Sequence, residues 1–285
     1  MRAKSHFSAG LIAGFFAAPI ASAQDADTTV DAQSQDDAMR EMARKAQDPL
    51  GSVRALMTDN TIAMNGGPDD DTSYSFQIQP VYAIENPTGF NMIARGILPV
   101  IGLEPGVVWP PIGPEPTPDK DSRWGLGDTV LQFFLSPKGG GNWKWGAGPQ
   151  VSLPTHTGDR QAGPGWGAGL AGVIFGSVGN WAIGGIAMQH WGEERYSVGT
   201  LQIIGLYNFD SLPGTYLGYN NSITYNWEGS SGDKLTLPLG ATVGRTLLLK
   251  SGDGLDLNLG AYAMAEKPQD APSWQLKFGI SYYFN

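Results

Sequence analysis

The sequence predicts an all-β fold, a transmembrane antiparallel β-barrel of twelve strands that follows a cleaved signal peptide. Three observations support this prediction. The 285 residues include 40 Gly and 20 Pro, which disfavour a helical bundle because both residue types destabilise helix interiors. Segments of 10 to 13 residues alternate apolar and polar side chains. Large aromatic residues gather near the ends of these segments, as in the interfacial girdles of membrane barrels.

The N-terminal residues 1–23 have the layout of a secretory signal peptide. Arg2 and Lys4 precede an apolar stretch over 7–20, and Ala21-Ser22-Ala23 supplies a small-residue cleavage pattern. The stretch is shorter than the roughly 20 residues that a membrane-spanning helix needs. Removing it makes the net charge of −9 still more negative, so we expect no nucleic-acid partner.

Residues 24–50 are polar, acidic and poor in bulky side chains, which is typical of a periplasmic leader or flexible linker. Within them, residues 36–46 favour a short helix, with Asp36 near its start and Lys45 near its end, as the helix dipole prefers. The barrel is expected to occupy residues 51–285.

The last segment, Trp274–Phe284, shows the clearest strand pattern. Its alternate residues from Trp274 to Phe284 are large and apolar, whereas Gln275, Lys277 and Ser281 lie on the other face. Similar alternation predicts strands over 74–84, 143–153 and 217–227, and weaker alternation predicts strands over 90–101, 124–135, 165–177, 181–191, 198–208, 235–247 and 255–264. Both ends of the chain lie on the periplasmic side only if one more strand is present, and residues 52–64 are the only candidate for it.

The connections between these strands alternate in length. Those at 102–123, 155–164, 192–197, 228–234 and 265–272 are longer on average than those at 85–89, 136–142, 178–180, 209–214 and 250–254. Long extracellular loops opposite short periplasmic turns are a property of bacterial outer-membrane barrels, which also have an even number of strands. A secreted soluble β-sandwich is the alternative, but its strands are usually about 5–6 residues long.

The expected site is the lumen of the barrel. We expect its lining to include polar-face residues and the membrane interfaces to hold tryptophans. The lumen candidates are Arg95, Asp128, Gln132, Lys144, Gln150, Asp256 and Lys277, and the interfacial aromatics are Trp124, Trp143, Trp166, Trp181, Trp191, Trp227 and Trp274. The five lumen charges are mixed in sign, which favours pairing across a hydrated lumen over the single-sign ring of a strongly ion-selective pore. Residues 102–123 or 24–50 are placed to narrow the opening.

Several short motifs resemble those of a known family of outer-membrane proteins. They are YSFQIQPV at 74–81, GLGDTVLQFFLSPK at 125–138, WGAGP at 145–149, GPGWGAG at 163–169, and YNWE with SGDK at 225–234. The family is the one associated with the meta-pathway of phenol degradation, whose members often carry the mistaken label neuromedin U. The resemblance covers about residues 48–285. The Pro-rich stretch over 102–118 and the final Asn285 depart from the family pattern.

The resemblance implies a Gram-negative outer-membrane barrel that transports small molecules, and it brings no catalytic residues. We therefore expect a channel or transporter for small solutes, among them aromatic or hydrophobic ones. The alternative function is a non-transporting structural or surface barrel of the envelope. The expected partners are outer-membrane lipid and the outer-membrane assembly machinery, which would recognise the apolar strand Trp274–Phe284.

Enzymatic activity is not expected. A Ser-His-Asp site would need His156 or His190. The two residues after these histidines are Thr157-Gly158 and Trp191-Gly192, whereas an outer-membrane phospholipase would need a Ser two residues after its His. The absence of cysteine excludes disulfides and Cys-based metal sites, and no cofactor or metal is predicted.

Overall fold

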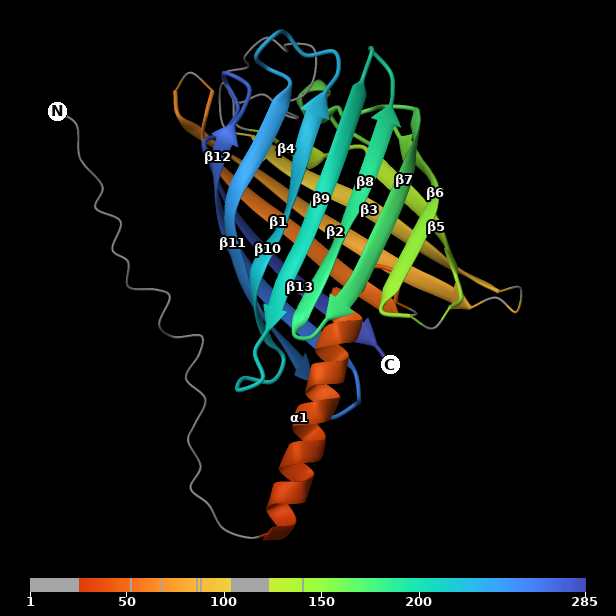
Figure 1. The fold of residues 1–285 in the computed structure, drawn as a ribbon. Helices are drawn as coiled ribbons and strands as arrows, with labels where there is room; N and C mark the ends of the chain where they lie inside the picture. Colours follow the sequence, from red (N-terminus) through yellow and green to blue (C-terminus); the bar gives the residue numbers. More distant parts are fainter. Residues whose placement is uncertain are drawn as a thin grey trace, which may run out of the picture. The chain divides into compact units, whose positions relative to one another are not determined.

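The computed structural model describes residues 26–51, 53–67, 69–85, 87, 89–103, 123–139 and 141–285 (Figure 1). The predicted signal peptide and most of the predicted 102–123 loop lie outside these residues. The chain divides into two compact units, Met1–Gln35 and Asp36–Asn285. Of the first unit, the structure describes the beginning of helix α1, which runs over Ala26–Gln47.

The second unit consists of the end of α1 and a single antiparallel sheet. Its strands are β1 (Arg54–Gly66), β2 (Asp71–Glu85), β3 (Phe90–Leu103), β4 (Arg123–Leu126), β5 (Thr129–Pro137), β6 (Trp143–Leu153), β7 (Gly167–Val178), β8 (Trp181–Trp191), β9 (Ser197–Asn208), β10 (Thr215–Asn226), β11 (Leu235–Leu248), β12 (Gly254–Glu266) and β13 (Trp274–Phe284). A short 3₁₀ turn, η1 (Asp159–Gln161), lies between β6 and β7.

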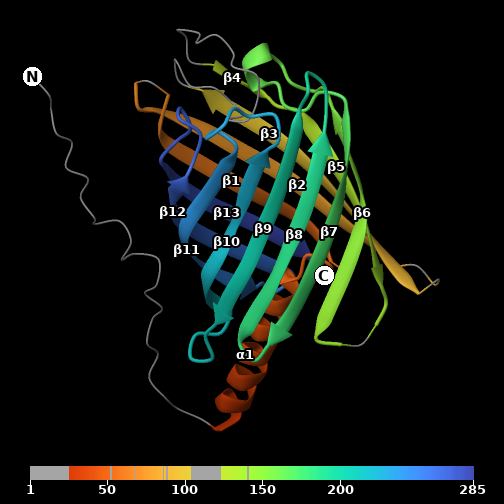
Figure 2. The ribbon, with the colours of Figure 1, turned by 45° about the horizontal axis from the view of Figure 1, so that its top comes forward.

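The sheet closes into a barrel. Consecutive strands pair with one another, β13 pairs with β1, and β4 and β5 both pair with β3 (Figures 1 and 2). Because β4 and β5 are two parts of one strand, the barrel has twelve strands, and the predicted fold is confirmed. Among the described residues, no helix is long and apolar enough to cross a bilayer.

The predicted strand 124–135 differs from the structure in one respect, because it is interrupted at residues 127–128. Here the side chains of the following loop replace strand pairing. Thr129 donates its backbone N–H to Thr155 Oγ1 at 2.9 Å, and the Asp128 carboxylate accepts amide N–H groups from residues 156–165. Strand pairing between β3 and β5 then continues from Val130 to Pro137.

The strands alternate as a membrane barrel requires, with large apolar side chains on the outside. On β7, Leu170 is 62% exposed and Ile174 is 54% exposed, whereas Ala171, Val173 and Phe175 are buried. Apolar surface of this extent, on many strands of one barrel, is costly in water and favourable against lipid hydrocarbon.

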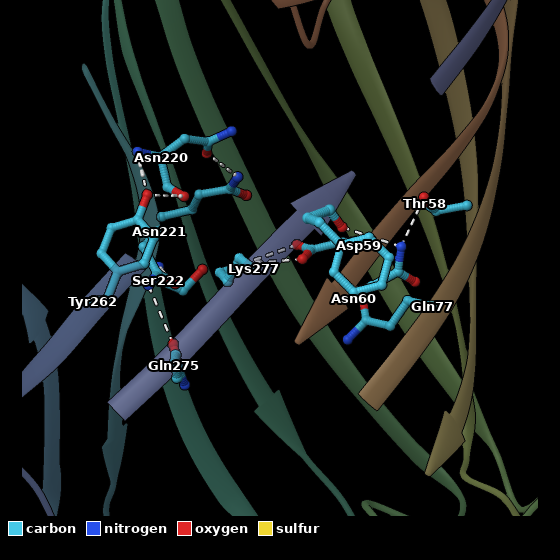
Figure 3. Close-up of polar contacts among 12 residues, drawn as sticks. Thr58, Asp59, Asn60, Gln77, Asn220, Asn221, Ser222, Tyr262, Gln275 and Lys277 are labelled. Atoms are coloured by element: carbon cyan, nitrogen blue, oxygen red, sulfur yellow. Dashed lines mark hydrogen bonds and ion pairs between the residues drawn. The ribbon is translucent and has the colours of Figure 1, made fainter. Parts of the chain in front are cut away.

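Three proline residues interrupt the backbone hydrogen bonding between neighbouring strands of the barrel wall. Pro80, Pro149 and Pro238 each lie where the pairing of two neighbouring strands skips residues. Proline has no N–H to donate to a ladder. Side chains compensate at Pro238, where Tyr219 donates its hydroxyl to the Pro238 C=O at 2.7 Å and the Tyr262 hydroxyl bonds the backbone N–H and C=O of Asn220 (Figure 3).

The first and last strands form the seam that closes the barrel. Its ladder skips residues 57–59 of β1 and 279–281 of β13. Thr58 fills this gap, because its Oγ1 accepts the N–H of Ile280 at 2.9 Å and donates to the same residue's C=O at 3.0 Å. Asn60 adds bonds to Thr58 and to the C=O of Phe278 (Figure 3). The seam is therefore held by side chains as well as by backbone.

Candidate functional site: the barrel lumen

The inside of the barrel is lined by polar side chains that are packed rather than free. Buried polar residues there include Gln79, Gln132, Gln150, Ser152 and Asp256. Each alternates along its strand with residues of the outer surface, as the two-residue period of a strand dictates. From the long-loop end to the short-turn end, the lumen has a loop anchor, an amide layer, a cavity and the end of α1.

The loop anchor is Asp128, whose side chain is fully buried. Its Oδ1 accepts the backbone N–H of His156 at 3.2 Å and lies 2.6 Å from His156 Nδ1. Its Oδ2 accepts the backbone N–H groups of Gly163 at 2.9 Å and Gly165 at 2.7 Å. Gly165 has φ of 61°, a conformation that favours glycine. One carboxylate thus organises the loop over 154–166.

Tyr196 lies in the neighbouring loop and belongs to the same region. Burial, together with the negative charge of Asp128, raises the pKa of Tyr196 to about 12. Its ring packs edge-on against His190, with 6.2 Å between the ring centroids. The Tyr196 hydroxyl therefore stays neutral at physiological pH.

Below the loop anchor lies a layer of amide side chains. Gln132 donates to Gln150 Oε1 at 2.9 Å, and Gln150 donates to the backbone C=O of Gln189 at 3.3 Å. His190 Nε2 lies 2.9 Å from Ser152 Oγ, with both side chains buried. This layer ties β5, β6 and β8 together through the lumen rather than through the wall.

A cavity of about 150 Å³ lies between the amide layer and the end of α1. Its lining has two characters. Apolar side chains come from β3, β5, β7, β8 and β9, whereas charged and amide side chains come mainly from β1, β2, β10, β12 and β13. The apolar side chains on those five strands are Ile93, Phe134, Val173, Ile186, Ile204 and Leu206, and Val53, Met57 and Val81 add apolar surface from β1, β2 and the residue before β1.

The charged side chains of the cavity are mostly paired. Lys277 Nζ lies 3.1 Å from the Asp59 carboxylate, a contact drawn in Figure 3. Asp256 accepts hydrogen bonds from the Tyr216 hydroxyl at 2.9 Å and from the Thr246 hydroxyl at 2.7 Å. Arg95 donates to Gln79 Oε1 at 2.5 Å. The lining therefore holds charges of both signs, with Arg95 on β3 and the other three of these charges on β1, β12 and β13.

The end of α1 closes the short-turn side of the cavity. Its last residues, with Asp48 and Pro49, belong to the cavity lining. Gln47 and Asn208 exchange two amide hydrogen bonds, at 2.9 and 3.0 Å. Tyr283 donates its hydroxyl to the C=O of Ala46 at 2.9 Å, and Lys144 Nζ lies 2.5 Å from Asp48 Oδ2.

Two buried apolar residues complete the contact between the end of α1 and the barrel. Ala43, on α1, is 2% exposed, and Leu50, just after the helix, is 3% exposed. Leu50 packs in one cluster with Ile93, Phe134 and Val173. The helix stops before Leu50 because Pro49 disfavours helical conformation at Asp48, and the Asp48 carboxylate instead accepts the backbone N–H of Leu50 at 2.9 Å.

The structure distributes the predicted lumen residues over all these levels. Asp128 lies at the loop anchor, Gln132 and Gln150 form the amide layer, and Arg95, Asp256 and Lys277 line the cavity. Lys144 lies at the short-turn end, with its side chain 44% exposed. The five predicted charges find their partners outside their own set. These partners are Asp48, Asp59, His156, the Tyr216 hydroxyl as a neutral donor and the Gln79 side-chain oxygen as a neutral acceptor.

The seven tryptophans predicted at the membrane interfaces are all exposed. Trp143 and Trp181 begin β6 and β8 at the short-turn end of the barrel. Trp191, where β8 ends, and Trp274, where β13 begins, lie at the long-loop end. The exposed fractions run from 44% for Trp181 to 62% for Trp166, with Trp124, Trp143, Trp191, Trp227 and Trp274 between them.

The sequence reasoning missed the seat of α1 on the barrel. The signal was present, because Met39, Met42, Ala43, Ala46 and Leu50 follow the three- and four-residue spacing of one helix face. The short apolar side chains and the acidic surroundings obscured it. The structure extends the helix predicted over 36–46 to Ala26–Gln47.

The polar groups of the lumen do not assemble into a Ser-His-Asp site. Ser152 contacts His190, whereas Asp128 contacts His156, so the two pairs use different histidines. Within the described part of the chain, no group of three His, Cys, Asp or Glu side chains is placed to bind a metal ion.

A closed, even-stranded barrel with an apolar exterior and a polar, partly filled lumen is the fold of outer-membrane channel proteins. A solved structure with this fold is the outer membrane channel from Pseudomonas putida F1, which is 15% identical in sequence, with a TM-score of 0.59 over 83% of this chain and 97% of that chain. A Pseudomonas aeruginosa FadL homologue is 10% identical, covering 86% of this chain and 94% of that chain, with a TM-score of 0.39. Neither a family model nor a curated protein matches the sequence.

Proposed function

We propose that the protein is a channel for small solutes in the outer membrane of a Gram-negative bacterium. The observation that carries the proposal is the cavity inside the barrel, which lies between a polar layer and the end of α1. A barrel built only to stabilise the envelope has no need of a two-sided internal cavity. The solved channel from Pseudomonas putida supports the proposal at the level of the fold.

We also propose how the chain reaches the outer membrane and to which family it belongs. Residues 1–23 act as a cleaved signal peptide, and the outer-membrane assembly machinery recognises the apolar strand Trp274–Phe284. The chain is also proposed to belong to the family associated with the meta-pathway of phenol degradation, on its motifs at 74–81 and 125–138. The solutes are small, and the family link alone names none of them. No enzymatic step is part of the proposal.

The described part of the lumen is closed at its short-turn mouth by residues 43–50, so the channel is proposed to be gated. Opening would require the end of α1 to leave its contacts with Asn208, Lys144 and Tyr283. Within the predicted leader, residues 43–50 are then a gate. The predicted lumen residues Arg95, Asp256 and Lys277 would line the path that this gate uncovers.

A specific observation favours the second candidate, a non-transporting envelope barrel. Gln132, Ser152 and Tyr262 are fully or almost fully buried, and side chains fill much of the lumen. Barrels of about eight strands are filled in this way, whereas barrels of 16 or more leave an aqueous channel. Twelve strands lie between these two cases.

Recording from the purified protein in planar lipid bilayers separates the two candidates. We expect stepwise conductance in KCl, with long closed periods because α1 occupies the mouth. Heat-modifiable mobility on a gel would show beforehand that the barrel is folded. A folded protein that inserts into the bilayer and never conducts would contradict the channel and support the envelope barrel.

A further inference from the structure

One cation of the cavity makes no ion pair with the described residues, although the negative charge of Asp59 acts on it from a distance. Arg95 makes a single hydrogen bond, from Nη2 to Gln79 Oε1, and its buried Nε has no hydrogen-bond partner. Gln79 is a neutral acceptor and is itself engaged with Gln77 at 2.7 Å. A half-buried guanidinium whose Nε is shielded from water and unpartnered is energetically costly, because its charge loses water without gaining an ion-pair partner in contact with it.

The other charges of the cavity do not satisfy Arg95. The Asp59 carboxylate is paired with Lys277, and Asp48 is paired with Lys144. Both oxygens of Asp256 accept hydrogen bonds, Oδ1 from Thr246 and Oδ2 from Tyr216. Arg95 is therefore the cavity charge with donors to spare, and its planar fork suits a carboxylate.

Apolar surface lies directly beside this guanidinium. Ile93 is two residues before Arg95 on the same face of β3, which places it about 7 Å away along the strand. Phe134 pairs with Ile93 across β3 and β5. Both side chains are buried and line the cavity, together with Val173 and Ile186. A ligand at Arg95 would thus have its charged group on one side and an apolar body on the other.

The volume limits the size of that body. The cavity measures about 150 Å³. A comparable apolar cavity, about 150 Å³ in an engineered protein, holds one benzene molecule. We propose that the cavity binds a small organic carboxylate with a single aromatic ring, whose carboxylate is held by Arg95 and whose ring packs on Ile93 and Phe134. The inference rests on the proposed channel function, since the site lies in the path of the solute.

Ligand-observed NMR titration of the detergent-solubilised protein tests the proposal with three probes. Benzoate carries both the ring and the carboxylate, benzamide is its neutral isostere, and acetate lacks the ring. We expect benzoate to bind about tenfold or more tightly than either, because a charge-assisted hydrogen bond is worth more than a neutral one. Arg95→Gln should abolish this preference for benzoate over benzamide, and Arg95→Lys should retain part of it.

Arg195→Gln is the matched control, because Arg195 lies in an exposed loop with its side chain 83% exposed and pairs with Glu228. It should leave benzoate binding unchanged. Equal binding of benzoate and benzamide by the unaltered protein, an absence of benzoate binding at millimolar concentration, or an unchanged preference in folded Arg95→Gln would each overturn the carboxylate site. Conductance in KCl is scored separately, so a conducting protein without benzoate preference refutes this site alone, whereas a silent protein refutes the channel.

Discussion

At the scale of single residues, Asp128 contributes most to the shape of the lumen mouth. A buried carboxylate that accepts three backbone N–H groups fixes the path of a loop more firmly than contacts between exposed side chains. The sequence placed Asp128 on the polar face of a strand, and in the structure the strand is interrupted at this residue. A periodic pattern cannot show such an interruption, because the amides that cause it come from residues 156–165, well beyond the strand.

We predict that Asp128→Ala loosens the loop over 154–166 and lowers the stability of the folded barrel. Three backbone amides would lose their acceptor, at a cost of about 1–3 kcal/mol for the buried amide of Gly165 and less for the half-buried amides of His156 and Gly163. Limited proteolysis should then cut within this loop, and the urea midpoint of unfolding in detergent should fall.

Asp159→Ala is the control, since Asp159 is an exposed residue of the same loop, at the start of η1. It should leave both measurements unchanged. If Asp128→Ala and Asp159→Ala behave alike, Asp128 is not the anchor of this loop.

At the scale of elements, the strands and the core of the helix were largely predictable, whereas the full length of the helix and its seat on the barrel were not. Strands β6, β8 and β13 have the predicted bounds, because one side of each faces out and the other faces in. The end of α1 is governed by tertiary contacts, and its small apolar residues fit a seat made by β9, β12 and β13. The pairing of charges inside the lumen could not be predicted from the sequence either, because Lys277 meets Asp59 only when the barrel seam closes.

A disulfide between α1 and the barrel should hold the proposed gate shut. The position of a Cβ at Gly254 lies 2.9 Å from Met42 Cγ, so the Cβ atoms of Met42→Cys and Gly254→Cys come within the roughly 4 Å that a disulfide needs. The chain has no other cysteine. We expect the oxidised double variant to conduct far less than the reduced one in planar bilayers.

The two single variants, treated with the same oxidant, control for damage and for the loss of Met42. They should conduct alike before and after reduction. Equal conductance of the oxidised and reduced double variant, with the disulfide shown by mass spectrometry, would mean that α1 does not gate the lumen.

At the scale of the whole molecule, the exposed apolar residues define what surrounds the barrel. Leu170 and Ile174 on β7 and Leu239 on β11 are each more than half exposed, and these two strands are well separated in the sheet. The composition and alternation of the sequence were sufficient to predict this distribution, because a strand has only two faces. A water-soluble barrel of this size would instead bury such residues against a second layer.

We predict that Ile174→Arg destabilises the protein folded in liposomes by about 2–4 kcal/mol, the range for Arg near the middle of a membrane barrel strand. Ile174 is 54% exposed and lies in the central part of β7. The free energy can be measured from reversible denaturant titration. Ser230→Arg, in the exposed loop before β11, should cost little. A similar small effect for both variants would contradict insertion of this face into lipid.

The seam between β1 and β13 has a consequence for the order of assembly. Part of the seat of α1 is Tyr283, which lies on the last strand and contacts Ala46 only once β13 is in place beside β1. The segment made first can therefore complete its docking only after the segment made last has paired. The last contact at the short-turn mouth forms after the barrel has closed around its circumference.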